Sequence, residues 1–172
     1  TIVDTSWFQI LNPVFIISLA PLYSKLWEKY KFSGPQKFFG GFTLLAAGFG
    51  MLAIGASSIP AGAATASVSM VWLLLAYFLH TMGELAVSPV GLSYVSKLAP
   101  ARMLGLLFGI WYVFTGLAGK LASIMAEYSD GIAENVGFSG FFLIFTIIPF
   151  LAGLAMLSLN KPIKRLMHGV DK

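Results

Sequence analysis

Residues 77–92, Tyr-Phe-Leu-His-Thr-Met-Gly-Glu-Leu-Ala-Val-Ser-Pro-Val-Gly-Leu, place one acidic side chain, Glu84, inside a long apolar run. A run of this length and composition is typical of a transmembrane helix. A carboxylate is costly to keep at the depth of the lipid chains, so an acidic residue there indicates a functional site with a partner or water beside it. Glu84 therefore connects the fold class of the protein to its function.

The composition of the 172-residue chain is that of an integral membrane protein. Hydrophobic residues make up 58% of the chain and charged residues only 10%, whereas soluble domains contain about 25% charged residues. The chain has no cysteine, which excludes disulfides and thiolate metal sites. Because residue 1 is Thr and no signal sequence precedes the first apolar run, we interpret the chain as part of a longer protein.

Five apolar runs are long enough to cross a bilayer. Each must form a helix, because backbone groups in lipid need hydrogen-bond partners within their own segment. The runs are continuous and show no alternation of polar and apolar residues, which argues against a β-barrel. We therefore predict an all-α integral membrane fold with five transmembrane helices, at about residues 7–27, 38–57, 71–98, 103–125 and 138–159.

The positive charges fall in every second connection. Of the eleven Lys and Arg residues, all but Lys120 lie in two of the connections or in the C-terminal tail, whereas connection 57–69 is uncharged and 127–134 is acidic. The positive-inside rule assigns the basic side to the cytoplasm. We therefore expect a multi-pass protein of the cytoplasmic (inner) membrane with residue 1 outside and the C-terminus inside. Because the basic residues are explained by the orientation of the protein in the bilayer, we expect no nucleic-acid partner.

Polar groups from different helices are predicted to lie at one depth. Asn12 precedes Lys25 by thirteen residues, and Glu84 precedes Lys97 by the same number. At 1.5 Å per residue, both side chains lie about 20 Å from the basic interface. They therefore meet near the middle of the bilayer.

Ser88 and Trp111 lie somewhat nearer to the same interface. Each is nine residues from a basic anchor, Lys97 or Arg102, which corresponds to about 13 Å. Groups from three helices near the bilayer midplane are typical of transporter substrate sites, as are helices broken or bent by proline. Pro13 and Pro89 fit this pattern, because each removes a backbone donor inside an apolar run.

The third predicted helix carries a polar stripe, since helical spacing puts six residues on one face: Tyr77, His80, Thr81, Glu84, Ser88 and Gly91. We interpret His80 as a structural residue, with a proton relay to Glu84 as the alternative. Two sets of glycines are interpreted as helix-packing surfaces: Gly41, Gly48 and Gly55 on the second helix, and Gly105, Gly109 and Gly116 on the fourth.

The sequence contains no metal-ligand spacing, Gly-rich phosphate loop or nucleophile–base pair, so we expect no enzyme, no catalytic residue and no metal. A structural or assembly subunit without a substrate is an alternative. It would explain the glycine surfaces, but not a carboxylate at mid-depth aligned with Asn12 and Trp111.

Two segments make the sequence specific to one family. Residues 7–21, Trp-Phe-Gln-Ile-Leu-Asn-Pro-Val-Phe-Ile-Ile-Ser-Leu-Ala-Pro, and residues 83–100, Gly-Glu-Leu-Ala-Val-Ser-Pro-Val-Gly-Leu-Ser-Tyr-Val-Ser-Lys-Leu-Ala-Pro, closely resemble the proton-dependent oligopeptide transporter (POT/PTR) family of the major facilitator superfamily. The resemblance extends over the whole chain through Gly109-Ile-Trp111. It implies that the five spans are helices eight to twelve, so that residues 1–172 form the C-terminal six-helix bundle without its first helix.

The resemblance also implies roles for individual residues. Glu84 would bind the amino terminus of the peptide and act in gating, by pairing with a lysine from the other half of the transporter. Asn12 would contact the backbone or amino end of the peptide, while Ser88 lines the pocket and Trp111 forms its wall. A carboxylate suits an ammonium group, and an amide can both donate and accept hydrogen bonds.

The implied function is proton-coupled symport of di- and tripeptides by alternating access, with no cofactor other than the proton as coupling ion. The implied partners are the N-terminal half and helix seven of the same transporter, and the acidic proton-coupling residue belongs to these parts. Some family members carry nitrate or other solutes, and this alternative remains open.

Overall fold

The computed structural model describes residues 5–59 and 68–166, and this part of the chain is helical without any strand. The elements are α1 (Thr5–Lys29), α2 (Gly34–Ala56), α3 (Met70–Leu98), the short 3-10 helix η1 (Ala101–Met103), α4 (Leu104–Glu127), α5 (Ser129–Ser158) and α6 (Asn160–Leu166). Five helices, α1 to α5, are long and apolar enough to cross a membrane, which confirms the predicted fold class. Residue 1, Lys172 and most of connection 57–69, to which we assigned membrane sides, lie outside the described residues.

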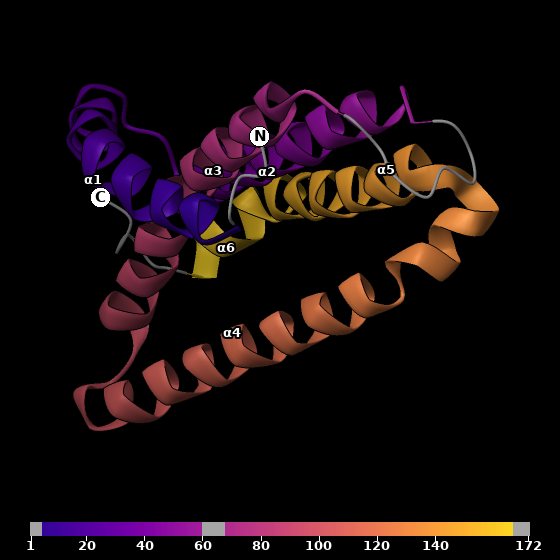
Figure 1. The fold of residues 1–172 in the computed structure, drawn as a ribbon. Coiled ribbons are helices and arrows are strands. Elements are labelled where there is room, and N and C mark those ends of the chain that lie inside the picture. Colours follow the sequence, from indigo (N-terminus) through magenta and orange to yellow (C-terminus); the bar gives the residue numbers. More distant parts are fainter. Residues whose placement is uncertain (1–4, 60–67, 167–172) are drawn as a thin grey trace.

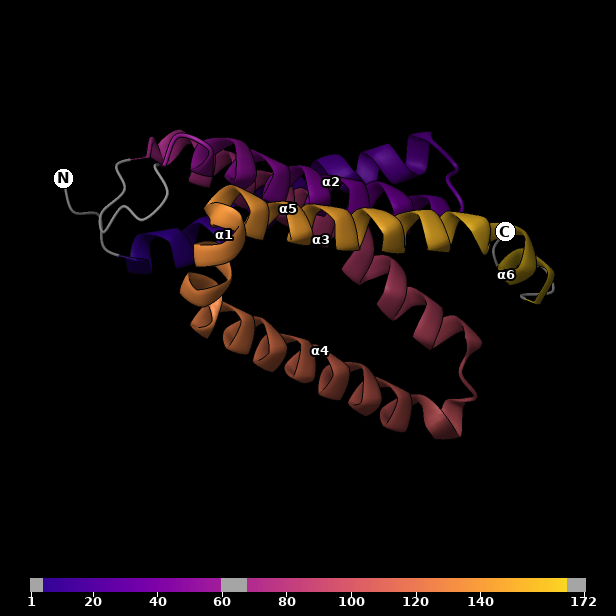
Figure 2. The same ribbon diagram turned by 90° about the vertical axis from the view of Figure 1, so that its right-hand side faces the viewer.

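Helices α2, α3 and α5 form the packed part of the molecule. Helix α2 lies between α3 and α5 and contacts both along its length, while α1 packs against α3 (Figures 1 and 2). Aromatic side chains fill the contact of α2 with α5, where the rings of Phe49 and Phe145 lie 5.5 Å apart. Helix α3 is thus held between α1 and α2, and it carries Glu84.

The close approach of α2 and α3 depends on glycine, as predicted for the second helix. A Cβ atom on Gly41 would lie 2.9 Å from the carbonyl oxygen of Gly83, and one on Gly55 would lie 2.9 Å from the Trp72 ring. Contacts this short are essentially absent from real structures, so no larger residue fits without a shift of the helices. These two glycines and Gly48 form a packing surface against α3, which confirms their predicted role.

His80 is packed into this same interface. A Cβ on Gly48 would collide with its imidazole, and the ring of Phe49 lies 4.5 Å from it. The backbone of Leu45 provides a hydrogen bond to the ring, but Nε2 is buried and has no partner among the described residues. The ring therefore serves the contact with α2, although its hydrogen bonding is incomplete.

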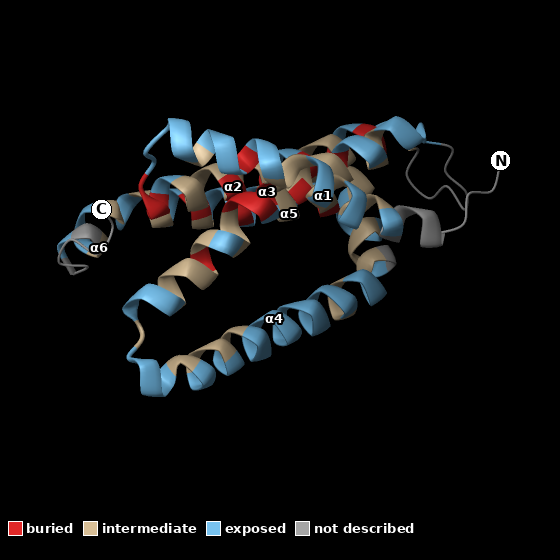
Figure 3. Ribbon diagram, turned by 90° about the vertical axis from the view of Figure 1, so that its left-hand side faces the viewer, coloured by how far each residue is buried: buried red, intermediate tan, exposed pale blue. Residues whose placement is uncertain are grey.

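Helix α4 runs apart from the packed helices and is joined to them at its two ends (Figures 1 and 2). It has no buried residue, and most of its length is exposed (Figure 3). Apart from the backbone of α4 itself, no described atom lies within 4 Å of a Cβ placed on Gly105, Gly109 or Gly116. The predicted packing role of these three glycines is thus not seen in this chain, because no described helix covers their face.

The structure adds local detail at the two prolines and in the acidic connection. Helices α1 and α3 continue through Pro13 and Pro89, so neither is broken there. Helix α3 nevertheless changes direction along its length, and its C-terminal part turns toward α4 (Figures 1 and 2). The acidic connection 127–134 is largely helical, because α5 begins at Ser129. Helix α5 is kinked at Gly137, whose φ of 73° is disfavoured for residues with a side chain.

Candidate functional site

Two of the predicted site residues are in direct contact. Asn12 Nδ2 on α1 donates a hydrogen bond of 3.3 Å to Glu84 Oε2 on α3. The residues are 72 positions apart in sequence, so the contact depends on the packing of α1 against α3. The contact agrees with the prediction that the two side chains meet.

Thr81 extends this pair into a network of three side chains. Its hydroxyl lies 2.8 Å from Asn12 Oδ1 and 2.8 Å from the carbonyl oxygen of Tyr77. The side chain is only 1% exposed, which makes it the most enclosed polar group of the cluster. Thr81 was placed on the polar stripe by its spacing but was not predicted as a site residue. Its sequence signal is only its position one turn before Glu84, whereas its contact with Asn12 becomes visible in the structure.

The neighbours of α3 decide which way Glu84 faces. Gly83 approaches Gly41 on α2, and Leu85 packs into the small core that α3 forms with Tyr23 of α1. Each of these α3 residues is one position, about 100°, away from Glu84 around the helix. Glu84 therefore lies at the edge of the contact with α1, where Asn12 reaches it, and its side chain remains exposed.

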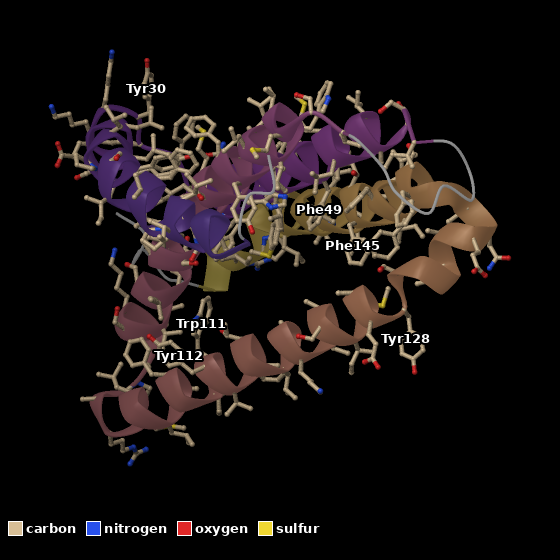
Figure 4. The ribbon with its side chains drawn as sticks, in the orientation of Figure 1. Tyr30, Phe49, Trp111, Tyr112, Tyr128 and Phe145 are labelled. Atoms are coloured by element: carbon tan, nitrogen blue, oxygen red, sulfur yellow. The ribbon has the colours of Figure 1, made fainter. Side chains whose placement is uncertain are left out.

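Ser88 and Trp111 continue the same face of α3 toward its basic end. Ser88 is one turn beyond Glu84 and half-buried. Trp111 points from α4 toward α3 (Figure 4), where a Cβ on Gly91 would lie 2.3 Å from its Cη2 atom. Gly91 follows Glu84 by two turns, so the indole contacts α3 about 10 Å along the helix from the carboxylate. Trp111 thus lies at the edge of the cluster rather than against Glu84.

The cluster can bind a cation that also forms hydrogen bonds. Asn12 occupies one oxygen of Glu84 at 3.3 Å, while the side chain remains exposed to further donors. An ammonium group carries three donors, and hydrogen bonds between charged partners are about twice as strong as neutral ones. The arrangement therefore favours a ligand with a primary amine over a simple anion.

Fold and site together define the class of protein. It is an all-helical membrane protein in which a carboxylate and an amide from two apolar helices share a hydrogen bond. The profile of the POT family matches residues 2–141. The chain is 35% identical to the uncharacterized transporter YclF of Bacillus subtilis over 170 residues, covering 97% of this chain and 33% of YclF. It is 32% identical to a di-/tripeptide transporter of Lactococcus lactis subsp. cremoris, covering 98% of this chain and 33% of the relative.

A solved structure shares the same arrangement of helices. The crystal structure of a POT peptide transporter in complex with alafosfalin superimposes with a TM-score of 0.83 at 30% identity, over 98% of this chain and 34% of that chain. The chain belongs to the POT family, whose members are transporters and not enzymes. It spans about a third of the length of these relatives.

Proposed function

We propose that the chain is the C-terminal part, helices eight to twelve, of a transporter that carries di- and tripeptides together with protons across the cytoplasmic membrane by alternating access. Membership of the POT family supports this proposal, as does the similarity to the di-/tripeptide transporter of Lactococcus lactis. The Lys and Arg distribution further supports an inner-membrane orientation with the C-terminus in the cytoplasm.

The contact between Asn12 and Glu84 carries the assignment of the site. In the proposed mechanism the carboxylate of Glu84 receives the ammonium group of the peptide, and the amide of Asn12 contacts its amino end or backbone. A free amino terminus is the feature that all ordinary peptides share, so one carboxylate can serve many side-chain combinations. This explains why a peptide carrier needs an acidic residue at a depth where charge is costly.

Ser88 and Trp111 complete the proposed wall. The Ser88 hydroxyl lies one turn from Glu84, and the indole of Trp111 closes the cluster toward the basic end of α3. An apolar surface with a few placed polar groups is the common composition of small-molecule sites. The opposite wall and the proton-coupling residue are assigned to the N-terminal half and helix seven of the transporter.

In alternating access, Glu84 also has a gating role in this proposal. A lysine from the other half can pair with the carboxylate when no peptide is bound, and the peptide ammonium then replaces that lysine. Such an exchange conserves the charge of the site, so the carboxylate has a cationic partner in both states. Peptide binding and opening of the gate are thereby coupled through one side chain.

The test is uptake of a labelled dipeptide by proteoliposomes that contain the full-length transporter and an inward proton gradient. Glu84→Gln keeps the size of the side chain but removes its charge, and we expect uptake to fall at least about tenfold, as for the loss of a charge-assisted hydrogen bond. Glu134→Gln is the matched control, because Glu134 is an exposed carboxylate on α5 away from the cluster.

Uptake at the wild-type rate by the Glu84→Gln variant would contradict the assignment of the site. Two other results would overturn the function itself. Competition by nitrate but not by unlabelled peptide would identify another solute, and absence of any uptake by the folded wild-type protein would favour an assembly subunit.

A further inference from the structure

A cavity with a volume of about 220 Å³ lies between the lysine-bearing ends of α1, α2 and α3. Lys37 of α2 and Lys97 of α3 line it together with Ser93, and none of the described residues around it is acidic. The cavity therefore has cationic groups from two helices and a hydroxyl between them. This composition suits an anion.

The cavity lies on the opposite side of α3 from Glu84. Ser93 follows Glu84 by nine residues, which is about two and a half turns and places the two side chains about 180° apart. Trp27 of α1 and Lys37 of α2 border the cavity on this side. The cavity is thus separated from the proposed peptide site by the whole of α3. In a transporter built from two halves around that site, the cavity therefore lies outside the substrate path.

The depth of the cavity is that of the lipid headgroups. Lys97 lies in the last turn of α3, Lys37 is the fourth residue of α2, and Trp27 is close to the end of α1. Lysine and tryptophan at helix ends mark the membrane interface. These ends lie on the side that the Lys and Arg distribution assigns to the cytoplasm, so the inference rests on the proposed orientation. Cytoplasmic leaflets are rich in anionic lipids.

Ring contacts hold the walls of the cavity in place. The ring of Tyr94 stacks on Phe38 at 6.4 Å, and the rings of Trp27 and Phe32 meet edge to face at 5.9 Å. Lys37 Nζ lies 4.8 Å from the centroid of the Trp27 ring, so the long lysine side chain follows the cavity wall. Because these groups are already ordered, a ligand loses less binding energy to the ordering of side chains.

We propose that this cavity binds the phosphate group of an anionic phospholipid of the inner leaflet. The ammonium groups of Lys37 and Lys97 approach the phosphate from α2 and α3, and the Ser93 hydroxyl donates a hydrogen bond between them. Basic cavities between transmembrane helices on the cytoplasmic side are known to hold lipid headgroups. A lipid here would link the ends of three helices.

Native mass spectrometry of the full-length transporter tests this site. Phosphatidylglycerol is titrated onto the protein, with phosphatidylcholine as the zwitterionic reference and inorganic phosphate as a competitor. The test variant is Lys37→Gln/Lys97→Gln. The matched control is Lys25→Gln/Lys29→Gln, which removes the same charge from exposed positions of α1 on the same side of the membrane.

We expect the test variant to lose its preference for phosphatidylglycerol over phosphatidylcholine by about tenfold, and the control to stay within about twofold of wild type. An equal loss in both variants would show general surface attraction and overturn the proposal. An unchanged preference in the test variant would do the same. Displacement of the lipid by millimolar inorganic phosphate would identify a soluble-anion site instead. None of these results depends on transport, so they are distinguishable from a failure of the proposed function.

A second measurement needs no lysine variant. Trp27 borders the cavity, so phosphatidylglycerol with brominated acyl chains should quench tryptophan fluorescence of the wild type more than brominated phosphatidylcholine does. The substitution Trp27→Phe should abolish this difference between the two lipids. A difference that persists in the Trp27→Phe variant would place the anionic lipid elsewhere and contradict the site.

Discussion

The hydroxyl of Thr81 on α3 lies 2.8 Å from the amide oxygen of Asn12 on α1. A hydroxyl has one proton to donate, and here it faces both this oxygen and the carbonyl of Tyr77. Donation to Asn12 fixes the amide with its oxygen toward Thr81 and its NH₂ group toward Glu84. The orientation that suits an ionised Glu84 is therefore held by a residue that does not itself reach the exposed side of the cluster.

Replacing Thr81 by valine tests this orienting role. Thr81→Val preserves the shape of the side chain but leaves Asn12 Oδ1 without its donor, so the amide can turn its oxygen toward Glu84. We expect the KM for a dipeptide to rise about fivefold, as for the loss of one neutral hydrogen bond, while the melting temperature changes by only a few degrees. Thr81→Ser, which keeps the hydroxyl, should restore the wild-type KM. An unchanged KM in the valine variant would remove Thr81 from the site.

The coupling between Asn12 and Glu84 is measurable in a double-mutant cycle. Dissociation constants for a dipeptide are compared for Asn12→Ala, Glu84→Gln and the double variant of the full-length protein. Because the side chains share a hydrogen bond of 3.3 Å, we expect the two losses to be non-additive, with a coupling free energy of about 1 kcal/mol. Strict additivity would mean that the contact does not contribute to peptide binding.

Helical geometry explains why this pair could be predicted from the sequence. The rise of an α-helix is constant, so equal distances from Lys25 and Lys97 place Asn12 and Glu84 at equal depth. Thr81 was missed because depth and spacing do not show which polar group on a stripe is buried against a neighbour. That information depends on how α1 crosses α3, and only the three-dimensional structure contains it.

The two glycine surfaces also show that sequence spacing does not identify the neighbouring helix. Both follow helical spacing, yet Gly41 packs against α3 whereas no other described helix approaches Gly109. The sequence of a helix indicates that a face suits close packing, but it does not identify the helix that covers it. Residues 127–134 were placed in a connection because they lie between two apolar runs, whereas α5 already begins at Ser129. Charge indicates exposure, and an exposed segment can still be helical.

A substitution of His80 tests whether this residue only packs α3 against α2 or also relays protons to Glu84. Its ring fills the contact of α3 with α2, and its buried Nε2 has no partner among the described residues. We therefore expect His80→Phe to keep dipeptide uptake within about twofold of wild type, because an apolar ring of similar shape removes an unsatisfied polar atom. Uptake measured from pH 5 to pH 8 should retain the wild-type profile. A flattened profile with normal expression would instead support a relay between His80 and Glu84.

Gly91 determines whether Trp111 can lie against α3. A Cβ at this position would lie 2.3 Å from Cη2 of the indole, far inside the contact distance. We expect Gly91→Ala to displace the ring and to lower the melting temperature of the full-length protein by several degrees, because overpacking of a tight contact typically costs about 1–3 kcal/mol. Gly40→Ala is the matched control, since nothing lies within 4 Å of a Cβ there. The double variant Gly91→Ala/Trp111→Phe should recover the lost stability, because phenylalanine lacks the second ring that carries Cη2. If the double variant is no more stable than Gly91→Ala alone, the effect of the methyl group arises from α3 itself, and the contact between Gly91 and Trp111 is not what positions α4.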